Sequence, residues 1–103
     1  MSEIILALNP EHLRIVRAIL ASALPPEAEV WVFGSRAGGL VKRSSDLDLA
    51  IDAGRRLTDR ELGTLQQEFE DSDLPFEVDV LDWQAISESF RAIIAKTRIL
   101  LDR

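Results

Sequence analysis

The strongest constraint on the fold is an alternation of carboxylates and aliphatic side chains over residues 46–52, which read Asp-Leu-Asp-Leu-Ala-Ile-Asp. Successive side chains of a β-strand point to opposite faces, so this period of two predicts a strand with one buried face. Leu47 and Leu49 would anchor the strand in a core, while Asp46 and Asp48 project together from the other face. The chain is therefore expected to fold around a sheet that presents two neighbouring carboxylates.

The segments around this strand alternate between extended and helical patterns. Strands are predicted over 29–33, 46–52 and 76–81, and helices over 10–24, 58–71 and from Asp82 toward Leu101. Asn9 with Pro10 marks the start of the first helix, and Thr58 with Glu61 fits a capping box at the second. The order helix, strand, strand, helix, strand, helix predicts an α/β (α+β) fold. We expect one domain, residues 1–103, in which a small mixed β-sheet is backed by helices on one face.

Composition narrows the class of protein. No apolar run approaches the roughly 20 residues of a membrane-spanning helix, and residues 1–8 lack the basic start of a signal peptide. The absence of cysteine excludes disulfides and thiolate metal sites and favours a cytoplasmic location. A net charge of −6 argues against binding to a long nucleic acid. The local cations Arg36, Lys42 and Arg43 still allow a site for a small polyanion.

The paired carboxylates of the central strand predict a site for divalent cations. Asp46 and Asp48 would lie about 6.6 Å apart along one face, close enough to share oxygen-preferring ions such as Mg²⁺. Asp79 alternates with valines on a later strand and joins the cluster if the two strands are neighbours. Glu77 has the same parity and is the alternative third carboxylate. The competing interpretation is that these are ordinary solvated aspartates. In that case the repulsion between their closely spaced negative charges would have no compensating cation.

A Gly34-Ser35 pair ends the strand predicted before the carboxylates. Glycine lets a backbone approach a ligand closely, Ser35 offers a hydroxyl, and the N–H groups of a following helical turn would attract phosphate. Arg36 can neutralise phosphate charge. A bare Gly-Ser pair is more often a simple turn, and the glycine patterns of phosphate loops and dinucleotide sites are absent. Its spacing to Asp46 and Asp48 is what favours chemistry on a nucleoside triphosphate.

The pair Gly34-Ser35, followed after ten residues by Asp46-x-Asp48, resembles the signature of the DNA polymerase β-like nucleotidyltransferase superfamily. The surrounding sequence is similar to its smallest branch, the minimal nucleotidyltransferases (MNT). The later Val-Asp-Val around Asp79 resembles the strand that carries the third carboxylate of that superfamily. In length and element order the resemblance covers almost the whole chain.

The resemblance implies roles for these residues and a partner for the protein. The nucleotide-binding residues would be Gly34, Ser35 and Arg36, and the catalytic and metal-binding residues would be Asp46, Asp48 and Asp79. Two Mg²⁺ ions would be bound, ATP would be the substrate, and Asp79 would help to take the proton from the incoming hydroxyl. Members of this branch typically pair with a HEPN-domain toxin and act as its antitoxin, and they can transfer AMP to a tyrosine of that partner.

The leading hypothesis is a Mg²⁺-dependent nucleotidyltransferase that transfers AMP from ATP to a hydroxyl of a HEPN-domain toxin and thereby acts as antitoxin. The predicted elements use nearly all 103 residues, so we expect the acceptor to arrive on another protein. Two alternatives stay open. One is an antitoxin that neutralises its partner by docking alone, and the other is transfer to a small molecule such as an aminoglycoside or to RNA 3′ ends. The sequence does not predict the base preference, the acceptor atom or the oligomeric state.

Overall fold

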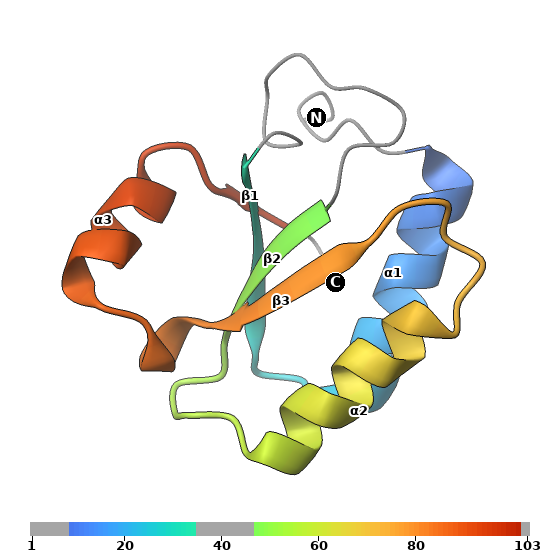
Figure 1. Ribbon diagram of the computed structural model, residues 1–103, viewed down its shortest axis with the longest axis horizontal. Coiled ribbons are helices and arrows are strands. Elements are labelled where there is room, and N and C mark those ends of the chain that lie inside the picture. The colour runs from blue at the N-terminus through green and yellow to red at the C-terminus, as the bar shows by residue number, and fades with distance from the viewer. Residues whose placement is uncertain (1–8, 35–46, 102–103) are drawn as a thin grey trace.

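A four-stranded sheet with helices on both faces makes up the described part of the chain (Figure 1). The computed structural model describes residues 9–34 and 47–101. Along the chain the elements are α1 (Pro10–Ala23), β1 (Glu29–Phe33), β2 (Leu47–Asp52), α2 (Asp59–Glu70), β3 (Val78–Asp82), the 3₁₀ helix η3 (Trp83–Ala85), α3 (Glu88–Ala95) and β4 (Ile99–Leu100). No helix among the described residues is long and apolar enough to cross a lipid bilayer.

The strands lie in the order β3-β2-β1-β4. β1 runs antiparallel to both β2 and β4, whereas β2 runs parallel to β3. A parallel pair needs a crossover connection, and α2 provides it here. The predicted small mixed sheet is therefore confirmed, although β3 begins two residues later than the pattern indicated.

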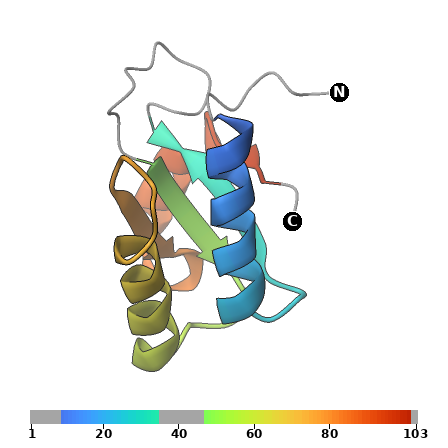
Figure 2. The ribbon, with the colours of Figure 1, turned by 90° about the vertical axis from the view of Figure 1, so that its right-hand side faces the viewer.

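Aliphatic side chains on one face of the sheet pack against α1 and α2, which lie side by side (Figure 2). Leu47, Leu49 and Ile51 are fully buried in this core, as the alternation in β2 predicts. Burying each such side chain contributes roughly 1.5–3 kcal/mol. The other buried members of the core are Val16, Leu20, Leu24, Ala28, Val30, Val32, Leu57, Leu65, Phe69, Val80 and Leu101. The core fixes the parity of β2 and so directs Asp48 to the opposite face.

The opposite face of the sheet is partly covered by α3, so the expectation of helices on one face alone is wrong (Figure 2). Ala50 shares the parity of Asp48 and is nevertheless fully buried, as is Ile94 of α3. The rings of Phe90 and Phe33 meet edge to face with their centroids 6.5 Å apart. An apolar patch on this face of β1 and β2 explains why a third helix packs there.

Two tryptophans and an arginine hold the segment after α3 against the sheet. The Arg98 guanidinium carbon lies 4.0 Å from the Trp31 ring centroid and 4.6 Å from that of Trp83. Arg91 donates a hydrogen bond of 2.9 Å from Nε to the Trp83 carbonyl. Cation–π contacts of this kind contribute about 0.5–2 kcal/mol each. They link β1, the end of β3 and the start of β4.

The C-terminal segment differs from the predicted single helix between Asp82 and Leu101. Asp82 does cap a helix, but that helix is the single turn η3, and α3 has its own cap in Ser87. α3 ends at Ala95, and β4 then pairs with β1. The edge of β1 carries backbone groups that need partners, and this requirement is invisible in the local apolar periodicity.

The predicted starts of the first two helices are confirmed. Asn9 accepts a 2.8 Å hydrogen bond from the N–H of Glu11 at the start of α1. Thr58 and Glu61 exchange hydrogen bonds of 3.0 and 2.8 Å, which completes the capping box of α2. Arg55 also grips both oxygens of the Glu61 carboxylate, at 2.9 and 2.8 Å. These local bonds fix where each helix begins and therefore how the helices meet the sheet.

Candidate active site

The carboxylates of Asp48 and Asp79 lie on neighbouring strands in the same row of the sheet. In the register, Asp48 is paired with Phe33 of β1 on one side and with Asp79 of β3 on the other. Neighbouring strands are about 4.8 Å apart, and paired residues point to the same face. The predicted juxtaposition of these two aspartates is thus found, on the face opposite the α1–α2 core.

Gly34 lies directly against the Asp48 carboxylate. Its φ of 78° belongs to the left-handed region that favours glycine. A Cβ at this position would collide with Oδ2 of Asp48 and lie 3.3 Å from Cγ of the same side chain. The end of β1 therefore approaches the Asp48 carboxylate more closely than any side chain at position 34 would allow. This contact is a stronger reason for a glycine than the turn that the sequence indicated.

Three of the six predicted site residues are described by the structure, and it brings them together as Gly34, Asp48 and Asp79. The other three, Ser35, Arg36 and Asp46, lie outside the described residues. In sequence they directly follow Gly34 or directly precede β2.

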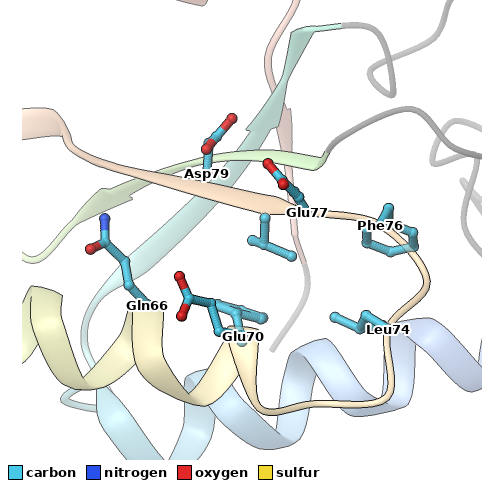
Figure 3. Close-up of a pocket in the computed structure, with 8 residues that line it drawn as sticks. Gln66, Glu70, Leu74, Phe76, Glu77 and Asp79 are labelled. Carbon is cyan, nitrogen blue, oxygen red and sulfur yellow. The ribbon is translucent and has the colours of Figure 1, made fainter.

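Glu77, the alternative third carboxylate, occupies a different place from Asp79. It precedes β3, and its carbonyl accepts a 2.9 Å hydrogen bond from the N–H of Leu47. Asp79, by contrast, is the residue in register with Asp48. Figure 3 shows the two carboxylates on the same side of β3, away from α2. The register therefore favours Asp79 as the partner of Asp48.

Two other aspartates at the far end of the same strands are already engaged. Asp82 is 6% exposed and accepts hydrogen bonds from the N–H groups of Leu57, at 2.8 Å, and Gln84, at 3.1 Å. Asp52 accepts from the N–H of Gly54 and from the Gln84 side chain, at 3.0 and 2.9 Å. Asp79 is exposed and accepts no hydrogen bond from the described residues. Asp82 and Asp52 are therefore structural groups.

The donor set of this row suits a hard divalent cation. Carboxylate oxygens are the ligands that Mg²⁺ prefers, and like charges paired across a sheet repel unless a cation lies between them. Within residues 9–34 and 47–101 no group of three or more potential metal-ligating side chains is gathered. Among the described residues, Asp48 and Asp79 are thus a pair of carboxylates rather than a complete ligand set.

A cleft between α2 and the outer edge of β3 was not indicated by the sequence. It has a volume of about 520 Å³ and is lined by Gln66, Phe69, Glu70, Leu74, Phe76, Glu77, Val78 and Asp79 (Figure 3). These residues come from the second half of α2, the following loop and β3. Because the cleft depends on how a helix crosses a strand, no local pattern could have revealed it.

Comparison with known proteins decides the family. Residues 17–103 match the family model described as polymerase beta, nucleotidyltransferase. This chain belongs to that family. It is 45% identical over 96 residues to the Haemophilus influenzae protein named "Probable protein adenylyltransferase MntA", covering 93% of this chain and 83% of that protein. The predicted resemblance to the nucleotidyltransferases, and to their minimal branch, is confirmed.

Solved structures share the fold. A toxin–antitoxin crystal structure with AMP-PNP superposes with a TM-score of 0.73 at 24% identity, covering 87% of this chain and 72% of that one. A complex of tri-AMPylated Shewanella oneidensis HEPN toxin with MNT antitoxin gives a TM-score of 0.69 at 20% identity, covering 92% and 72%. At such identities the likeness establishes the polymerase β-like architecture of this chain.

Proposed function

We propose that this protein is a Mg²⁺-dependent nucleotidyltransferase that transfers AMP from ATP to a hydroxyl of a HEPN-domain toxin and so acts as its antitoxin. The observation that carries the proposal is the row formed by Gly34, Asp48 and Asp79. Identity of 45% to a protein named as a probable protein adenylyltransferase supports the choice of AMP and of a protein acceptor. The AMP-PNP and AMPylated-toxin complexes of structural relatives agree with the same assignment.

The residues of the site divide between the two halves of the reaction. Gly34 brings backbone close to the triphosphate, and Ser35 and Arg36 would add a hydroxyl and a cation beside it. Asp46, Asp48 and Asp79 would hold two Mg²⁺ ions, which supply charge to stabilise the α-phosphate and the leaving pyrophosphate. The roles of Asp48 and Asp79 are supported by their chemistry and their register, and those of Ser35, Arg36 and Asp46 by their chemistry and the family resemblance.

The reaction proposed here is a single displacement at phosphorus. The acceptor hydroxyl oxygen bonds to the α-phosphorus, the bond from that phosphorus to the bridging oxygen breaks, and pyrophosphate leaves. The Asp79 carboxylate accepts the hydroxyl proton and later releases it to water. Asp79 can do so because it is exposed and accepts no hydrogen bond from the described residues.

The test is transfer of label from ATP to the partner. Incubation with the HEPN-domain toxin, Mg²⁺ and ATP labelled at the α-phosphate should label the toxin, whereas label at the γ-phosphate should leave with pyrophosphate. The chain itself contains no tyrosine, so AMP-tyrosine in a digest can come only from the partner.

The matched control separates the site from general loss of charge. Asp48→Asn with Asp79→Asn should abolish labelling, and Asp59→Asn with Asp73→Asn, which alters two exposed aspartates elsewhere, should retain it. Undiminished labelling by the first pair would refute the proposed chemistry.

Docking alone is the second candidate function, and one observation favours it. The α3–β4 side exposes Phe90, Ile93 and Leu100 by 37%, 62% and 49%, more than is usual for large apolar side chains. If docking suffices, the variant with Asp48→Asn and Asp79→Asn will protect cells from the toxin at full strength.

A further inference from the structure

The order of the strands separates the two sides from which the substrates reach the site. The row runs from Phe33 of β1, with Gly34 directly after it against Asp48, through Asp48 on β2 to Asp79 on β3. In an in-line displacement the attacking and leaving oxygens lie on opposite sides of the phosphorus. If Gly34 marks the triphosphate and its leaving pyrophosphate, the acceptor hydroxyl enters from the Asp79 side. That side is the outer edge of β3.

The edge of β3 provides space for a substrate segment. β3 is the terminal strand of the sheet, and no described strand pairs with its outer side. The cleft of about 520 Å³ lies along this edge and includes Asp79 in its lining (Figure 3). An extended peptide that paired with this open edge would pass beside Asp79, whose carboxylate projects from the side of β3 away from α2 (Figure 3). Docking of a peptide along an open strand edge is a common recognition mode.

The charges along the cleft favour a positively charged occupant. All the ionisable residues that line it are acidic: Glu70 extends from α2 toward the strand, and the carboxylates of Glu77 and Asp79 lie along its β3 edge on the side away from α2 (Figure 3). Gln66 adds an amide. Figure 3 shows Gln66 and Glu70 reaching from α2 toward the strand. Its remaining lining is apolar, with Phe69, Leu74, Phe76 and Val78. A segment with Lys or Arg near an apolar or aromatic residue complements this surface.

We infer that the cleft between α2 and β3 binds the acceptor segment, an extended and basic stretch of the partner protein that places its hydroxyl beside Asp79. This inference rests on the proposed function and adds to it the chemical class of the acceptor and the route by which it enters. Donor and acceptor then occupy different surfaces: ATP the β1 end of the row, and the partner segment the β3 end.

Glu70 is the residue with which to test the cleft, since it lies on α2 and outside the row. Replacing Glu70 by a neutral or cationic residue should not destabilise α2, because Glu70 is its last residue and positive charge is favourable at the C-terminus of a helix. Glu70→Gln should raise the KM for the partner toxin about 3-fold and Glu70→Lys about 10-fold, which are the effects of partly exposed charge pairs. The kcat and the KM for Mg-ATP should stay within 2-fold.

The matched control is Asp73→Lys, which makes the same charge change on an exposed loop residue outside the cleft. It should leave the KM for the toxin unchanged. An unchanged KM for the toxin with Glu70→Lys would overturn the inference, and so would a parallel rise in the KM for Mg-ATP. If the unaltered protein labels no partner at all, the proposed function fails and the inference falls with it.

Cross-linking can place the segment directly, because the chain has no cysteine of its own. A photoreactive group on Gln66→Cys should capture the toxin peptide that carries the labelled hydroxyl and that contains Lys or Arg. The same group on Gln67→Cys, the neighbouring exposed residue outside the cleft, should not. Capture of a different peptide, or of one without basic residues, would refute the assignment.

Discussion

The two ends of β2 and β3 carry the same residue type in opposite circumstances. At one end, Asp48 and Asp79 face each other on the side of the sheet away from the main core, and Asp79 accepts no hydrogen bond from the described residues. At the other end, Asp82 is 6% exposed and accepts two backbone hydrogen bonds. A carboxylate that satisfies backbone donors contributes to stability, whereas one set against a like charge costs stability until a ligand arrives. The comparison separates the structural aspartate Asp82 from the two aspartates that we propose to be functional, and it does so without reference to any relative.

The largest effect expected is on activity at the Asp48 end. Asp48→Asn removes a charged oxygen from the proposed metal site and should lower the rate of AMP transfer on the order of 10³-fold, or about 4 kcal/mol of transition-state stabilisation. Asparagine keeps the shape of the side chain and one oxygen acceptor, so the free energy of unfolding should fall by less than it does when the Asp82 side chain is removed. Rates of toxin labelling and denaturant unfolding measure the two quantities. A variant that loses stability and activity together would undo the distinction between the two ends.

The next effect concerns stability at the Asp82 end. Asp82→Ala leaves the buried N–H group of Leu57 and the partly buried N–H group of Gln84 without their acceptor, which should cost about 2–3 kcal/mol. For a domain of this size the melting temperature should fall by roughly 4–8 °C per kcal/mol. Asp79→Ala, three residues upstream on the same strand, should change the melting temperature little. Equal melting temperatures for the two variants would contradict the assignment of Asp82 as structural.

Two glycines test the close approach at the Asp48 end. Gly34 and Gly54 have nearly equal φ values, 78° and 77°, so an added side chain strains both backbones by about 1–2 kcal/mol. Only at Gly34 would the new Cβ collide with another group, the Asp48 carboxylate. Gly34→Ala should therefore lose both stability and AMP transfer, while Gly54→Ala loses stability alone. Comparable transfer rates for the two variants would show that the approach of Gly34 to Asp48 is unimportant for catalysis.

The smallest expected effect is on the pH dependence of stability, through Glu61. This carboxylate accepts hydrogen bonds as Asp82 does, but it lies near the surface. Hydrogen bonding to Arg55, and then to the backbone of Thr58, lowers the pKa of Glu61 from 4.5 to about 2. A depressed pKa gives stability that is fully present above about 4.5 and is lost as the pH falls toward 2. Glu61→Gln should reduce the pH dependence of the melting temperature within that window and leave it unchanged above pH 6. An identical dependence in both proteins would mean that the Arg55–Glu61 pair adds nothing to folding.

How far the sequence predicted these features depends on the range of the interactions involved. The parity of Leu47 and Asp48, and the capping box of Thr58 and Glu61, were predictable because each depends on residues a few positions apart. The neighbourhood of Asp48 and Asp79 was a conditional prediction, since it required the two strands to be adjacent.

Other features were beyond local patterns. The pairing of β4 with β1 and the place of α3 on the second face arise from backbone groups and apolar surface that only the assembled sheet exposes. The contact of Gly34 with Asp48 likewise joins two strands, so the sequence indicated a glycine turn without its cause. Helix caps and strand parity depend on residues close together in the sequence, whereas the proposed substrate surfaces depend on residues that only the folded chain brings together.

The stacking of Arg98 on Trp31 and Trp83 gives this chain an intrinsic fluorescence probe. These two are its only tryptophans, and it has no tyrosine, so all of its indole fluorescence originates around one guanidinium. Lifting the segment after α3 from the sheet would alter the surroundings of both indoles at once. Emission spectra can therefore report, without an attached dye, whether this segment stays packed on the sheet when the toxin binds.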